Sequence, residues 1–97
     1  MDDEAIATII KYINEKLPEP DIKWTKEAFD TRTTERWAAF EIIERLMDRP
    51  FDMPDMVVYD YMIKMSVYSY YHDNTERKYI FRVASNTAEK ILNLFVH

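Results

Sequence analysis

The side chains that could do chemistry in this sequence are few, and they gather around one histidine. Ser69, His72 and Asp73 are the residue types of a catalytic triad, but they are close neighbours on the chain, without a nucleophile elbow or oxyanion hole. His72, Asp73 and Glu76 match no known metal-loop spacing. We therefore expect no catalytic, cofactor-binding or metal-binding residues. A metal-assisted enzyme centred on His72 remains an alternative hypothesis.

Two residue types that many active sites need are absent from the chain. There is no cysteine, which excludes disulfides, thiolate nucleophiles and sulfur ligands for metals. There is no glycine, so standard phosphate-binding loops and dinucleotide fingerprints are excluded. The acidic start of the sequence is unlike a signal peptide, and no apolar run approaches the length of a membrane span. We expect a cytoplasmic protein.

The charge balance bears on the class of partner. Thirteen basic and 18 acidic residues give a formal net charge of -5, whereas nucleic-acid-binding proteins usually present a basic face. Arg77, Lys78 and Arg82 form the densest basic group, which supports only a weak hypothesis of DNA contact. An acidic chain without chemistry of its own suggests instead an inhibitor that occupies the basic site of a nucleic-acid-handling protein.

Helical periodicity covers most of the 97 residues, which we interpret as a single helical domain over residues 1-97. Ile6, Ile9, Ile13 and Leu17 fall on one face of a helix that Pro18 ends. The clustered threonines between residues 30 and 34 are poor helix-interior residues, so the second helix is expected to begin near residue 34. The predicted fold is all-α, a small, mostly antiparallel four-helix bundle with helices at about 2–17, 34–48, 55–72 and 74–96.

The region between residues 56 and 84 also supports a different interpretation. Its β-branched and aromatic residues favour strands, and Tyr79, Phe81 and Val83 alternate with Lys78, Ile80 and Arg82 as in a strand. The alternative fold is therefore α+β, with a hairpin at about 56-84 and a C-terminal helix. We favour helices, because the first strand would be unusually long and because helical spacing continues to Phe95.

The predicted core follows from the same periodicity. It contains Ile6, Ile10, Ile13, Leu17, Trp37, Phe40, Ile43, Met47, Val58, Tyr61, Met65, Tyr68, Phe81, Ala84, Ala88, Ile91 and Phe95. Within it, Phe40→Ala is expected to cost about 3–5 kcal/mol, as deletions of buried aromatic side chains do.

The third predicted helix has a second apolar face in addition to the one in the predicted core. That face consists of Met56, Tyr59, Ile63, Val67 and Tyr70. A helix with two apolar faces must be covered on both sides. Either it is the central helix of the bundle, or one face is left for another chain, for which tyrosine and methionine are suitable residues. Our leading hypothesis is a small non-enzymatic protein-interaction module that could form a homodimer through this helix.

Overall fold

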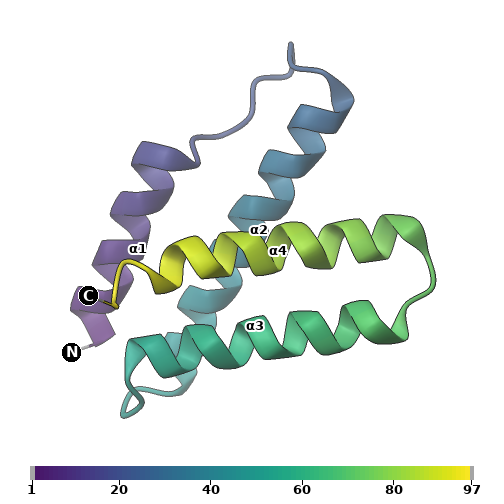
Figure 1. The fold of residues 1–97 in the computed structure, drawn as a ribbon. Helices are drawn as coiled ribbons and strands as arrows, with labels where there is room; N and C mark the ends of the chain where they lie inside the picture. Colours follow the sequence, from purple (N-terminus) through teal and green to yellow (C-terminus); the bar gives the residue numbers. More distant parts are fainter. Residues whose placement is uncertain (1, 97) are drawn as a thin grey trace.

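The computed structural model describes residues 2–96, which form four α-helices (Figure 1). They are α1 (Asp2–Lys16), α2 (Lys26–Asp48), α3 (Pro54–Tyr71) and α4 (Thr75–Leu92). No strand is present within these residues. The predicted all-α four-helix fold is confirmed.

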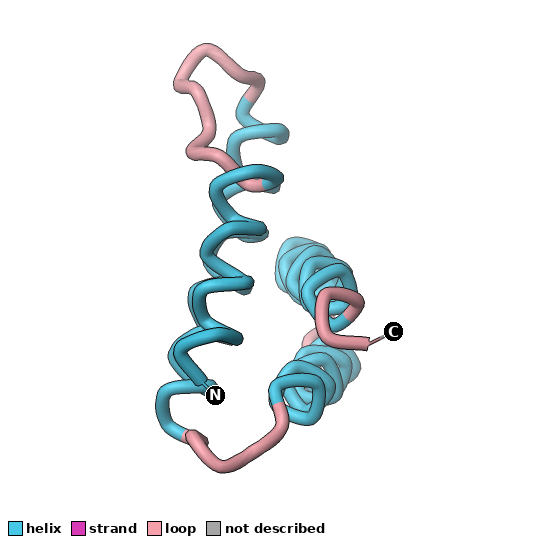
Figure 2. Tube along the Cα trace, turned by 90° about the vertical axis from the view of Figure 1, so that its left-hand side faces the viewer, coloured by secondary structure: helices cyan, strands magenta, loops and turns pink. Residues whose placement is uncertain are grey.

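The helices are arranged as two hairpins. α1 and α2 run in opposite directions, as do α3 and α4, and the second pair crosses the first (Figure 1). In Figure 2, α3 and α4 are seen nearly end-on while α1 and α2 are seen from the side. The two pairs meet mainly where α2 packs against α4, and α1 packs mainly against α2. α3 therefore lies at the edge of the molecule.

α2 begins at Lys26, about two helical turns earlier than the sequence indicated, so the predicted start near residue 34 is wrong. Thr25 is its N-cap, and the Thr25 hydroxyl accepts a hydrogen bond of 3.2 Å from the amide of Ala28. The threonines that argued against a helix are accommodated inside it. The hydroxyls of Thr33 and Thr34 donate to the carbonyls of Phe29 and Asp30, four residues back, at 2.9 and 3.0 Å.

The β-hairpin alternative for residues 56-84 is wrong. Both segments are helical, and a short turn at residues 72–74 joins them. Pro54 stands in the first turn of α3, where its missing N–H costs nothing. Asn74 caps α4, and its side-chain oxygen accepts from the amides of Glu76 and Arg77 at 2.8 and 3.2 Å. The β propensity of α3 is overridden because its residues fill a helical face of the core.

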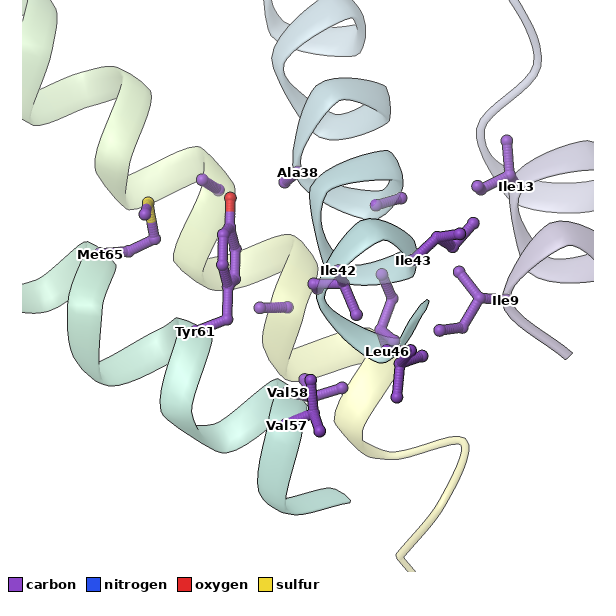
Figure 3. Packing of buried hydrophobic residues seen from close by; sticks show 14 of the residues in the cluster. Ile9, Ile13, Ala38, Ile42, Ile43, Leu46, Val57, Val58, Tyr61 and Met65 are labelled. Atoms are coloured by element: carbon purple, nitrogen blue, oxygen red, sulfur yellow. The ribbon is translucent and has the colours of Figure 1, made fainter. Parts of the chain in front are cut away.

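The core lies where the two hairpins cross, and much of it is built from small side chains. Ala38 and Ala39 of α2 and Ala84 and Ala88 of α4 are completely buried. Small side chains at a crossing let helix backbones approach closely. Around them, Figure 3 shows Tyr61 and Met65 of α3 on one side of α2, and Ile9 and Ile13 of α1 on the other.

The predicted core was correct for α4, for most of α3 and for part of α1, but of its four α2 residues only Ile43 is buried. The buried residues of α2 are Ala38, Ala39, Ile42, Ile43 and Leu46. Of the predicted core residues, five are exposed: Ile10, Trp37, Phe40, Met47 and Tyr68. Hydrophobicity favoured the aromatic residues of α2, whereas close packing against α4 requires its alanines. The buried face is consequently rotated away from Trp37 and Phe40.

Candidate protein-interaction surface

The outer face of α3 is the apolar face that the sequence singled out. The opposite side of the helix is fully committed to the core, through Val57, Val58, Tyr61 and Met65. On the outer side, all five predicted interface residues are exposed, with between 46% and 79% of each residue accessible. We call this set the α3 stripe: Met56, Tyr59, Ile63, Val67 and Tyr70. At 1.5 Å per residue, it runs for about 21 Å along the helix.

The stripe contains no charged residue, and the charges near it lie on its flank. Asp60 accepts from Arg49 at 3.0 Å and pairs with Lys64 at 3.3 Å. Arg49 also donates to Asp52 at 2.6 Å, which ties the turn before α3 to the helix. The hydrogen bond from Lys64, with further help from Arg49, holds the pKa of Asp60 below its usual value. Asp60 is therefore ionised at neutral pH.

A shallow groove of about 430 Å³ extends the stripe toward the end of α4. Met56, Tyr59 and Ile63 form one wall, and Leu92 and Val96 contribute from α4 and the residues after it. Asp55, Asp60 and Arg49 complete its lining. The groove adds apolar area beside the first half of the stripe and has charged groups at its edge.

The outer face of α4 provides a contrast within the same hairpin. The exposed residues of this face are polar or charged: Lys78, Arg82, Asn86, Glu89 and Lys90, followed by Asn93 just after the helix. An ordinary solvated helix has such a face. The apolar outer face of α3 is thus not a general property of this small protein. Within this hairpin, only α3 has an apolar outer face.

Sequence reasoning missed a second group of exposed apolar residues, because it assigned them to the core. Trp37, Phe40 and Met47 of α2 are between 40% and 64% exposed. Glu44 and Asp48 are interspersed on the same exposed side of α2, and the Arg36 guanidinium lies 5.6 Å from the Phe40 ring centre. Charge interrupts this group, whereas it does not interrupt the α3 stripe. The sequence does contain one signal for the buried face of α2. Two small residues, Ala38 and Ala39, stand between Trp37 and Phe40, and small residues are suited to a close helix contact.

The largest hollow, about 1080 Å³, lies between the second half of α3, the first half of α4 and the start of α2. Its lining combines apolar and aromatic residues such as Met65, Tyr70 and Phe81 with the oppositely charged Glu76, Lys78 and Arg82. It is an open depression between helix ends. Lys78 and Arg82, from the basic group predicted as a weak DNA contact, are exposed beside it together with Glu76.

The acidic residues near His72 do not gather into a metal-binding group in the described part of the chain. The His72 ring packs against the Phe81 ring, with centres 5.2 Å apart, at the end of α3. No group of three or more histidine, aspartate or glutamate side chains is placed to hold a metal ion among the described residues. His97, the second histidine, lies outside those residues.

Two arginines of α2, Arg32 and Arg36, have a structural role. Arg36 donates to the Leu17 carbonyl at 2.6 Å, and Arg32 donates to the Pro18 carbonyl at 2.9 Å. These bonds give partners to carbonyls at the C-terminal end of α1, where no further helical turn supplies N–H donors. They hold α1 against α2.

Comparison with known proteins adds no family. No protein-family model, no curated protein and no solved structure matches the chain. Of the helices described for residues 2–96, none has the combined length and apolar character needed to cross a membrane.

Proposed function

We propose that this protein is a non-enzymatic protein-interaction module and that the α3 stripe is its binding surface. The observation that carries the proposal is the pairing of a completely buried inner face on α3 with an uninterrupted apolar outer face. Exposed apolar patches of this kind mark interaction sites, since leaving them in water is unfavourable. Tyrosine and methionine are well suited to such contacts. Tyrosine presents a large ring with a polar tip, and methionine is flexible enough to fit an irregular surface.

The alternative hypotheses have weaker support. The acidic-inhibitor hypothesis rests on the net charge of -5, but the exposed carboxylates are spread over α1, α2 and α4 and interleaved with basic residues. The hypothesis of an enzyme at His72 has only the proximity of a few polar residues on the chain. The α3 stripe is a continuous exposed apolar surface, which neither alternative explains.

Site-specific photocrosslinking in a lysate of the source cells tests the proposal. A photoreactive amino acid replaces Ile63 in the stripe, and the control places it at Asn86 on the polar outer face of α4. We expect a crosslinked species of discrete mass from position 63 that position 86 does not give. Adding Tyr59→Ser, which removes a stripe side chain, should reduce its yield. Equal crosslinking from both positions would contradict the proposal.

A further inference from the structure

Three features mark the surface of the described residues: the hollow between α3 and α4, the exposed aromatic residues of α2, and the α3 stripe. The hollow is open, and its charges are mixed. The α2 group is interrupted by Glu44 and Asp48. Of the three, the stripe alone has a residue spacing that points to one particular binding partner.

The pattern is a symmetry in the spacing of the stripe. From Met56 to Tyr70, the sequence positions of successive stripe residues differ by three, four, four and three. The intervals are the same in both directions, and Ile63 is the midpoint. A second copy of the helix, turned end for end about a two-fold axis at Ile63, therefore presents its side chains in the same register.

From this we infer that the α3 stripe binds a second copy of this chain, with the two α3 helices antiparallel and crossing at Ile63. The inference rests on the proposed function and names its partner. Ile63 meets Ile63 of the second copy, Tyr59 meets Val67, and Met56 meets Tyr70. The last pair joins a thioether to an aromatic ring, which is a favourable contact. Two-fold pairing of one patch with itself is the commonest form of association in soluble proteins.

The charges on the flank favour the antiparallel arrangement. About a two-fold axis at Ile63, the flank that bears Asp60 and Lys64 lies beside the same flank of the second copy. Asp60 of one copy then lies about 3 Å along the helix axis from Lys64 of the other, at 1.5 Å per residue. Asp60 and Lys64 already pair within one chain at 3.3 Å, so the dimer joins two opposite-charge pairs into one network. A parallel pairing would place this flank beside the neutral Ser66.

The position of α3 leaves room for a second helix. In Figure 2, α4 lies above α3 and the crossing helix α2 lies to its inner side, while the lower outer side of α3 has no helix over it. Helices pack with axes 8–10 Å apart, so contact through the stripe requires no rearrangement of the fold.

The area of the stripe sets the expected strength. From their exposed fractions, the five side chains offer on the order of 600 Å² per copy, since one exposed aromatic side chain presents about 150–250 Å². Complete burial of the stripe in both copies would remove at most roughly 1,200 Å² from water, the lower limit of a standard specific interface. We therefore expect a reversible dimer with a Kd in the micromolar range.

Single cysteines test the register, because the natural chain has none. Met56→Cys and Tyr70→Cys are purified separately, and oxidised alone and as a mixture. We expect the mixture to form a disulfide dimer efficiently, and Ile63→Cys to do so alone. Met56→Cys alone should not, since its two copies would lie about 21 Å apart. Asn86→Cys measures random collision. Efficient crosslinking of Met56→Cys alone would overturn the antiparallel register.

Sedimentation equilibrium of the purified chain tests whether the dimer forms. Between about 1 µM and 1 mM, the mass should rise from the 11.8 kDa of one chain toward twice that value. Ile63→Glu should weaken association at least tenfold, because two carboxylates would meet on the axis, while Asn86→Glu should leave it unchanged. A monomer at every concentration would overturn the second copy as partner. If position 63 still crosslinked to a different protein in the lysate, the stripe would remain a binding surface, but its partner would not be a second copy of this chain.

Discussion

Removing the hydroxyl of Tyr61 should stabilise the protein. The Tyr61 side chain is completely buried, and none of the described residues offers its hydroxyl a hydrogen-bond partner. Figure 3 shows the ring standing among α2, α3 and α4, with its oxygen directed along the core. Burying an unsatisfied hydroxyl costs about 1–3 kcal/mol in proteins. Tyr61→Phe relieves this cost and keeps the ring beneath the Arg45 guanidinium, which lies 4.8 Å from its centre.

The magnitude follows from two opposing contributions. Deleting one oxygen leaves a void of roughly 10–15 Å³, which costs about 0.3 kcal/mol at the measured dependence on cavity volume. The net expectation for Tyr61→Phe is a gain of about 1–2 kcal/mol in the free energy of unfolding. Urea denaturation followed by circular dichroism, at a few micromolar protein, measures it. Tyr71→Phe is the control, because Tyr71 is largely exposed and should change stability by less than about 0.5 kcal/mol.

The pH dependence supplies a second readout for Tyr61→Phe. Burial, assisted by Glu41, raises the pKa of Tyr61 well above its usual value of 10.0. Above about pH 10 the unfolded chain loses this proton while the folded chain keeps it, so stability falls as pH rises. The wild type should lose more stability between pH 9 and 11 than Tyr61→Phe does. If Tyr61→Phe instead loses more than about 1 kcal/mol at neutral pH, the hydroxyl has a partner and this description of the core is wrong.

Three further predictions concern the core, a helix cap and a flank charge, and each is measured by urea denaturation. Leu46→Ala should lower the free energy of unfolding by about 2–5 kcal/mol, because Leu46 is completely buried. Phe40→Ala should lower it by only about 1–2 kcal/mol, because Phe40 is half exposed. A larger loss for Phe40→Ala than for Leu46→Ala would mean that the face of α2 predicted from the sequence is the buried one. Asn74→Ala should cost about 1 kcal/mol through loss of the α4 cap, and no loss would mean that the turn holds α4 without it. The pKa of Asp60 is lowered, so its contribution is present above its unfolded pKa and is lost as pH falls below about 4; Asp60→Asn should flatten that acid slope, and an unchanged slope would contradict the pairing with Lys64.

Sequence reasoning succeeded where hydrophobic periodicity was strong and failed where small residues decided the packing. The helices α1, α3 and α4 follow from spacing and helix-end signals, and the exposed stripe of α3 was identified because the helix has two apolar faces. On α2, the aromatic residues Trp37 and Phe40 outweighed Ala38 and Ala39 in hydrophobicity. The alanines are buried because α4 must come close, and this requirement is visible only in the tertiary structure.

Local chemistry explains the other errors. The threonines at the start of α2 were expected to delay the helix, since their branched side chains are unfavourable in helix interiors. In the fold, Thr33 and Thr34 bond back to carbonyls of the preceding turn, and the Thr31 hydroxyl lies 2.6 Å from the Tyr79 hydroxyl of α4. Contacts between residues 48 positions apart cannot be read from a single sequence.

Two-dimensional amide NMR of the wild type, recorded from low micromolar to millimolar concentration, tests the central claim that the α3 stripe is the binding surface. We predict that concentration-dependent shifts concentrate on α3 around Ile63, between Met56 and Tyr70, and that the outer face of α4 around Asn86 stays unchanged. Shifts that concentrate instead at Trp37, Phe40 and Met47 would place the binding surface on α2 and contradict the account.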